Sequence, residues 1–152
     1  MPFGKIALLL YLFSFNGVSG IAQSNSPFST GVLTVIITNF KSDLGQVYVG
    51  LFNQQAAFPK LPEKAVRKFF GSISNHKAIV IFDNLPEGEY AISVFHDENS
   101  NHKMDTNFLG IPKEGIGASS DAMGHFGPPK YKDAKFIFNH NQQTIVIKIV
   151  YL

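Results

Sequence analysis

Short runs of alternating apolar and polar residues, separated by polar turns, constrain the fold of this chain most. Successive side chains of a strand point to opposite faces, so a period of two predicts strands with one apolar face. Val32 to Thr38, for example, places Leu33, Val35 and Ile37 on one face. Comparable patterns predict further strands over residues 46–53, 77–82, 89–95, 134–138 and 144–151. With almost no helical period, the chain is expected to be all-β: an antiparallel sandwich of immunoglobulin or transthyretin type, with about seven strands and one long Gly/Pro-rich loop.

Three connections can be interpreted from their residues. The strands at 134–138 and 144–151 are expected to form a hairpin across residues 139–142. In the turn over residues 83–88, Pro86 presets φ and Gly88 is available for a positive φ. Residues 54–71 fit either a short helix over 63–70 or a strand that ends at Phe70 and pairs with the strand after it. The strand is preferred, and the cations there are interpreted as a solvated face: Lys60, Lys64, Arg67 and Lys68.

Size, charge and composition exclude several classes of protein. The 152 residues suffice for one domain with a sizeable core but not for two ordinary ones. The formal net charge is +2, and the lysines are interspersed with acidic residues. A nucleic-acid partner is therefore not expected, since it requires a clustered basic face. The chain has no cysteine, which excludes disulfides, thiolate zinc sites and thiol catalysis.

The N-terminus has the pattern of a secretory signal. Lys5 precedes an apolar stretch from Ile6 to Phe15, and Gly20 and Ala22 are small residues at the cleavage positions. We expect a signal peptide over residues 1–22, a flexible leader over 23–31 and one sandwich domain over 32–152. The apolar stretch is too short to span a membrane, so the mature protein is expected to be exported, periplasmic or secreted, without a membrane span.

In the loop that follows the strand at 89–95, oxygen-bearing residues have the spacing of Ca²⁺ ligands. A calcium loop offers oxygens at positions 1, 3, 5 and 9 and a backbone carbonyl at position 7. Counting from Asp97, these positions are occupied here by Asp97, Asn99, Asn101, Lys103 (through its carbonyl) and Asp105. Carboxylates and amides alternate as they do in such sites, so Ca²⁺ is the predicted cofactor.

The calcium pattern is incomplete. Position 12, where a bidentate Glu normally completes the coordination sphere, is Phe108. Glu98 or Glu114 would have to fold back to supply the missing carboxylate. Binding in the weak extracellular range, roughly 10⁻⁴–10⁻³ M, is therefore expected at most. The alternative needs no ion, because Asp and Asn side chains in such a loop can bond their own backbone as Asx-turns. Both interpretations stay open, with the ion slightly favoured.

Several motifs in order resemble one known family. They are residues 84–91 (NLPEGEYA), 94–99 (VFHDEN), 103–107 (KMDTN), 110–115 (GIPKEG) and 128–136. The chain resembles family number 2141 among the bacterial domains of unknown function, which are small secreted proteins with a prealbumin-like β-sandwich. The resemblance implies this fold, export and an acidic Asn-rich loop, but no established activity. Family members usually have glycine where this chain has Ser100 and His102, and a glycine permits the positive φ that closes a loop on an ion.

The long segment Asn107 to Lys132 is the expected binding surface. It is rich in Gly and Pro, and loops of this length in a compact domain are usually functional or disordered. Scattered apolar residues, such as Ile116, Met123 and Tyr131, indicate that it packs on the sandwich. Carbohydrate, peptide or an envelope protein are the partners considered.

Two further functions are alternatives to this binding or structural module. One is an envelope hydrolase that uses His96, Glu114 and Ser119. Asp97 cannot easily orient His96 in such a site, because adjacent residues on a strand point to opposite faces. The other is a subunit or carrier in an envelope assembly that uses an exposed sheet face or strand edge. The sequence favours a protein without catalytic activity.

Overall fold

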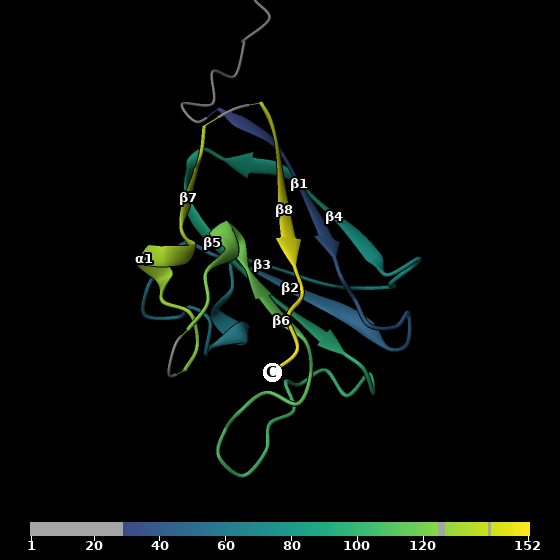
Figure 1. Ribbon diagram of the computed structural model, residues 1–152. Coiled ribbons are helices and arrows are strands. Elements are labelled where there is room, and N and C mark those ends of the chain that lie inside the picture. The colour runs from purple at the N-terminus through teal and green to yellow at the C-terminus, as the bar shows by residue number, and fades with distance from the viewer. Residues whose placement is uncertain (1–28, 125–126, 140) are drawn as a thin grey trace, which may run out of the picture.

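The computed structural model describes residues 29–124, 127–139 and 141–152 (Figure 1). This part of the chain forms eight strands, two short 3₁₀ turns and one short helix. The strands are β1 (Thr30–Thr38), β2 (Gln46–Phe52), β3 (Arg67–Gly71), β4 (Lys77–Pro86), β5 (Gly88–Asp97), β6 (Ile116–Ala118), β7 (Phe136–Phe138) and β8 (Gln142–Lys148). The 3₁₀ turns are η1 (Pro62–Lys64) and η2 (Ser119–Asp121), and the helix is α1 (Tyr131–Ala134). No helix in these ranges is long and apolar enough to span a membrane.

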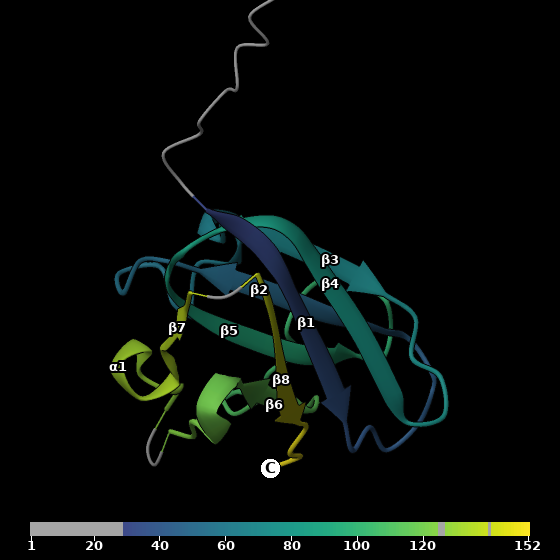
Figure 2. The ribbon, with the colours of Figure 1, turned by 90° about the horizontal axis from the view of Figure 1, so that it is seen from above.

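The strands form two sheets that lie one over the other (Figure 2). The smaller sheet has the order β4-β1-β8, and the larger one has the order β3-β2-β5-β6, with β7 paired to β5. The predicted all-β sandwich is confirmed. All pairs are antiparallel except β1 with β8, which run parallel from Val32↔Gln142 to Thr38↔Lys148. The predicted signal peptide and most of the predicted leader lie outside the described residues, and β1 begins at Thr30.

The main core lies between the two sheets, where the alternating residues meet. Leu33, Val35 and Ile37 of β1 are fully buried, as the period of two predicts, and they pack with Val49 of β2 and Ile92 of β5. Burying one such side chain contributes about 1.5–3 kcal/mol. The opposite face of the smaller sheet is not covered: Ile79, Ile81 and Val146 are exposed there. The use of an exposed sheet face in an envelope assembly stays a prediction.

A second core covers one end of the outer face of the larger sheet. Phe52 of β2 contacts Phe58 edge-to-face at 5.5 Å, and Phe58 contacts Tyr131 of α1 in the same way at 5.9 Å. Ala91 of β5 and Ala134 of α1 complete this cluster with residues from β6 and its flank. Strands β2 and β5 are therefore buried on both faces at this end, which explains why both of their faces are apolar.

The predicted C-terminal hairpin is wrong. Strand β7 pairs with β5, through Gly88↔Phe138 and Tyr90↔Phe136, whereas β8 pairs with β1 in the other sheet. The period of two fixes which side chains are buried but not which neighbour a strand takes. Here β8 occupies the side of β1 left open by β4, and its parallel ladder continues in the bond from Ile149 N to Thr38 O at 2.9 Å.

Residues 54–71 contain the preferred strand, but its predicted partner is wrong. Strand β3 pairs with β2 in the larger sheet, from Leu51↔Arg67 to Val47↔Gly71, and not with the following β4. The turn after it instead binds a different loop, since the Asp43 carboxylate accepts the backbone N–H of Asn75 and His76. These bonds favour the ionised carboxylate and lower the pKa of Asp43.

The segment predicted to be a turn, residues 83–88, is mostly strand, because β4 continues to Pro86 and β5 begins at Gly88. Its residue with positive φ is Asn84, at 47°, in β4 where the register against β1 shifts, and not Gly88. Asn tolerates this left-handed conformation better than most side chains do, which leaves Gly88 free to begin β5.

Candidate functional site

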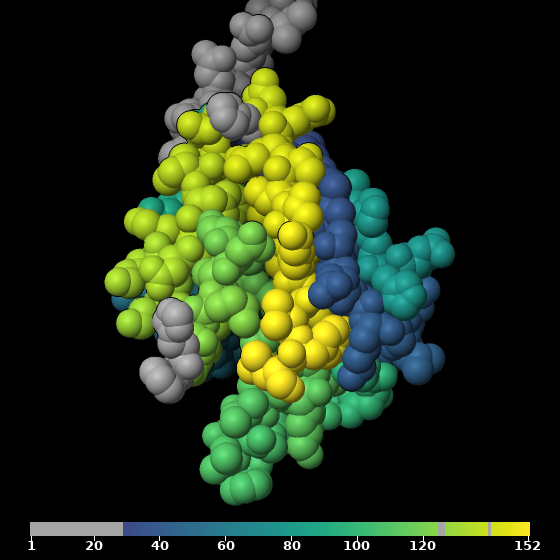
Figure 3. Space-filling model, in the orientation of Figure 1, coloured from purple at the N-terminus to yellow at the C-terminus, as the bar shows by residue number. Residues whose placement is uncertain are grey.

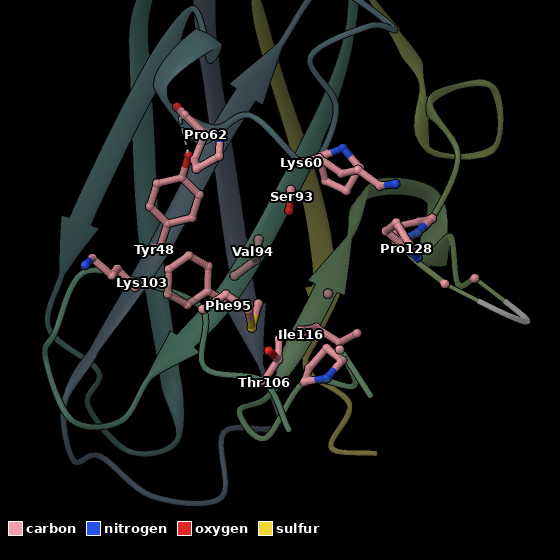
Figure 4. A pocket seen from close by; sticks show the side chains of 18 of the residues that line it. Tyr48, Lys60, Pro62, Ser93, Val94, Phe95, Lys103, Thr106, Ile116 and Pro128 are labelled. Carbon is pink, nitrogen blue, oxygen red and sulfur yellow. Dashed lines mark hydrogen bonds between the residues drawn. The ribbon is translucent and has the colours of Figure 1, made fainter. Parts of the chain in front are cut away.

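A groove of about 1210 Å³ occupies the end of the outer sheet face that the second core leaves uncovered (Figure 4). Its floor belongs to the larger sheet, and its walls are three connecting segments. The walls come from the segments at residues 59–63, 102–112, 122–124 and 127–129, with Leu152 near the C-terminus. Residues 102–112 lie in the segment between β5 and β6, which projects from the body of the molecule in Figure 3. Ligand sites are usually concave, largely apolar and few per protein, so this groove is the candidate site.

The register of four adjacent strands builds the floor of the groove. Tyr48 of β2 is opposite Phe70 of β3 and Phe95 of β5, and Phe95 is opposite Ile116 of β6. The Tyr48 ring stacks on Phe95 at 4.7 Å and contacts Phe70 at 5.0 Å. Tyr48 and Phe95 are only 3% and 6% exposed, so the ring faces are already occupied by each other. The floor is therefore an apolar surface fixed by packing, with little freedom to rearrange.

Ser93 of β5 is a small residue of the floor and lies beyond Tyr48 and Phe95 in Figure 4. Its cross-strand neighbours are also small, Gly50 of β2 and Ala118 of β6. Gly50 has no space for a side chain, because an added Cβ would lie 2.5 Å from the Tyr48 hydroxyl.

The charged residues that line the groove are mainly cations. Lys60, Lys68 and Lys103 line it with one carboxylate, Glu63. Lys68 shares the groove face of β3 with Phe70, since side chains two residues apart lie on the same face. Burial, and secondarily the nearby Glu63, raises the pKa of Tyr48 to about 12. The Tyr48 phenol is thus a neutral hydroxyl at physiological pH and faces the Pro62 carbonyl.

The acidic loop next to the groove is held by the carboxylate of Asp97. Asp97 ends β5 and is fully buried. Its Oδ1 accepts the N–H of Asn101 at 3.0 Å, and its Oδ2 accepts the N–H of His102 at 2.9 Å and the Gln46 amide at 2.8 Å. Charge-assisted bonds of this kind fix the loop to the end of the strand.

The other predicted metal ligands are joined by hydrogen bonds, Lys103 through its backbone N–H. Asn99 and Asn101 donate through their amides to the Asp105 carboxylate, at 2.7 Å and 3.1 Å. Asn99 Oδ1 accepts the Asn101 N–H, and Asn101 Oδ1 accepts the Lys103 N–H. These bonds are the Asx-turns of the alternative interpretation. Through them the polar side chains of the loop find hydrogen-bond partners within the loop, without an ion.

Glu114 takes part in the loop without occupying a ligand position of the predicted pattern. Its buried carboxylate accepts the backbone N–H of Glu98 and of Asp105, both at 2.9 Å. Glu114 therefore ties both ends of the loop together. No group of three or more His, Asp or Glu side chains suited to a metal occurs in the described ranges. Because the predicted site relies on two Asn side chains and a carbonyl, calcium binding stays a prediction.

Two residues of the loop adopt the conformation for which glycine is best suited. Ser100 and His102 have φ of 56° and 63°. The backbone therefore has the positive φ at both positions for which glycine, the residue usual in the family, is suited. The His102 ring also contacts Phe70 at 4.6 Å, so this side chain connects the acidic loop to the groove wall.

The three residues of the hydrolase alternative belong to separate hydrogen-bond networks. His96 bonds to the Tyr151 hydroxyl and the Leu44 carbonyl, both at 2.7 Å. Ser119 accepts the Ile92 N–H and donates to the Ala134 carbonyl, while Glu114 binds the loop backbone. No hydrogen bond in the described part of the chain joins any two of them.

The segment predicted to be the binding surface provides much of the groove, but its floor was not anticipated. Residues 109–112, 116–117, 122–124 and 127–129 of that segment line it. The sequence did contain a signal for the floor. Both faces of the strands at 46–53 and 89–95 are apolar, which indicates that the outer face of their sheet is at least partly covered.

The sequence model of one protein family, described as an uncharacterized protein conserved in bacteria (DUF2141), matches residues 35–146. The chain belongs to this family. The match extends from β1 to β8 and includes the acidic loop and the groove floor. No curated protein and no solved structure matches the chain. Family membership thus agrees with the resemblance noted from the motifs and adds no activity.

The positive φ of Ser100 gives a testable prediction. Ser100→Gly is expected to raise the free energy of unfolding by about 0.5–1 kcal/mol, because glycine adopts this conformation without a steric cost. Thermal or denaturant unfolding measures the change. Lys103→Gly, at an exposed position of the same loop without positive φ, is the matched control and is expected to destabilise. Equal losses in both variants would contradict the prediction.

Proposed function

We propose that this protein is an exported binding module whose site is the groove on the outer face of the larger sheet. The observation that supports the proposal most is the combination of a large apolar hollow with a rigid aromatic floor. Four side chains that line it are also exposed large hydrophobics: Leu109, Ile111, Met123 and Leu152. Exposed apolar surface gathered in a concavity is typical of a site that a ligand covers.

A groove-filling substitution tests this site. Ser93→Trp places a large ring in the hollow and is expected to reduce binding of the neutral apolar dye Nile red at least tenfold, measured by its fluorescence. Thr144→Trp is the control, since Thr144 is exposed on the smaller sheet and does not line the groove.

A second variant tests the same groove if the Ser93→Trp protein does not fold. Lys68→Trp substitutes an exposed groove residue of β3 and is expected to weaken dye binding as well. Circular dichroism establishes that each variant is folded. Unchanged binding in both folded groove variants, or equal loss in Thr144→Trp, would refute the groove as the site.

Export is supported by the N-terminal sequence. Lys5, the apolar run from Ile6 to Phe15 and the small residues Gly20 and Ala22 form the pattern of a cleaved signal. Expression of the full chain in a bacterium is expected to give an envelope or secreted product whose first residue is Gln23, as read by N-terminal sequencing. An uncleaved chain that remains in the cytoplasm would overturn this part of the proposal.

Weak calcium binding by the loop from Asp97 to Asp105 is a second proposal. It is supported by the convergence of Asn99 and Asn101 on the Asp105 carboxylate, which gathers the side chains that would coordinate the ion. An ion there would neutralise this cluster and order the wall of the groove that follows. Because the loop is already satisfied by Asx-turns, the expected affinity is in the range of about 10⁻⁴–10⁻³ M.

A melting experiment tests the calcium proposal. With a dissociation constant near 10⁻³ M, about 10 mM Ca²⁺ is expected to stabilise the native state by roughly 1.4 kcal/mol relative to chelator. Asp105→Asn, which keeps the shape of the side chain but removes its charge, is expected to abolish most of the shift. A midpoint that is the same in Ca²⁺ and in chelator would exclude this proposal and leave the groove proposal unaffected.

A further inference from the structure

We infer the class of ligand that the groove binds, and this inference rests on the function proposed above. The ligand is an amphipathic anion with one long apolar chain and a carboxylate head, as in a fatty acid. The inference combines the lining of the groove with the sign of the charges around it. The chain of the ligand lies over the aromatic floor, and its carboxylate lies beside a lysine that lines the groove.

The shape and chemistry of the floor favour a chain over a sugar or a peptide. Sugars stack on exposed aromatic faces, but Tyr48 and Phe95 are almost fully buried against each other and Phe70. A peptide bound by strand addition pairs with a free sheet edge. The floor is a sheet face, and the β6 edge beside it is bonded through Ile116 to Val150 in both directions, at 2.9 Å and 2.8 Å.

The size of the groove also favours a long chain. Its volume of about 1210 Å³ exceeds the roughly 300–1,000 Å³ of sites for drug-sized ligands. The exposed Leu109 and Ile111 on one wall and Met123 on another extend the apolar surface beyond the floor. A long apolar chain covers such a surface without requiring hydrogen-bond partners, which are few in this lining.

The charges select the head group. Lys60, Lys68 and Lys103 come from three different segments and line the groove, whereas Glu63 is the only acidic residue among the described residues of the lining. Neither of the two salt bridges found in the described ranges involves these lysines. Figure 4 shows Lys60 extending toward the wall that carries Pro128, with Lys103 at the opposite side. Because Lys60 and Lys103 lie on opposite sides, a carboxylate at one side can pair with the flexible ammonium group there while its chain stays on the floor.

The four cations of residues 60–68 are all exposed, as expected for a solvated face. Lys60 and Lys68 also line the groove, whereas Lys64 and Arg67 do not. The strand conformation of β3 separates them, because Lys68 lies on the same face as Phe70 and Arg67 on the opposite face.

Competition against bound Nile red tests the head group. Laurate and dodecan-1-ol have the same chain length and differ in the carboxylate, so the ratio of their affinities isolates the charge. In the unchanged protein at neutral pH, laurate is expected to bind about fivefold to tenfold tighter than the alcohol. Added salt is expected to reduce this ratio, because it screens exposed charges.

Matched lysine variants show where the preference arises. The double variant Lys60→Gln and Lys68→Gln is expected to bring the ratio close to one, because the affinity for laurate falls more than the affinity for dodecan-1-ol. The control double variant Lys77→Gln and Lys132→Gln removes the same charge at exposed positions that do not line the groove, and is expected to keep the ratio.

The outcomes separate this inference from the groove proposal. Equal affinity for laurate and dodecan-1-ol in the unchanged protein would overturn the anionic head while leaving an apolar groove. Displacement of the dye by an acidic, leucine-rich peptide but by neither lipid would overturn the assignment in favour of a peptide. If Nile red itself is insensitive to Ser93→Trp and Lys68→Trp, the groove proposal fails independently of the ligand class.

Discussion

The fold depends on the need to bury both faces of the β2–β5 pair. Val49 and Ile92 face the smaller sheet, whereas Phe52 and Ala91 face outward and would be exposed in a simple two-layer sandwich. The segments around Phe58 and α1 cover that outer face, but only at one end. The other end keeps an aromatic floor without a complete cover, and the groove is the consequence. Fold and site thus follow from one constraint, since the same strands that form the core also form the floor.

Two buried carboxylates give the adjoining loop its shape. Asp97 accepts bonds from the backbone inside the loop, and Glu114 accepts bonds from Glu98 and Asp105 at its two ends. Buried carboxylates are costly unless they are hydrogen-bonded, so both must keep these partners. The loop is consequently held in a conformation that includes Ser100 and His102 at positive φ. The part of the groove wall that this loop supplies, His102 and Lys103, is therefore anchored by hydrogen bonds of the chain itself.

Much of the fold could be predicted because each strand carries its own signal. The alternation at Leu33, Val35 and Ile37 identifies a buried face without knowledge of any other strand. The partners of β3 and β8 could not be predicted, because pairing depends on which strand edges remain open after the others assemble. For the site, the acidic loop was anticipated, with Asx-turns as one of two open interpretations, and the Gly/Pro-rich stretch indicated parts of two walls. The floor and the separation of Lys68 from Arg67 were not anticipated, because they require the register of four strands.

The sequence by itself determined the fold class, the family, the acidic loop and the need for some cover over β2 and β5. These follow from local periodicity, local motifs and residue chemistry, which act within a few positions of the chain. Only the tertiary structure decided that β8 runs parallel to β1, that His96, Glu114 and Ser119 belong to separate networks, and that Tyr48, Phe70 and Phe95 lie side by side. Such contacts join residues far apart in the chain, so their geometry is set by the competition of all segments for the same buried surface.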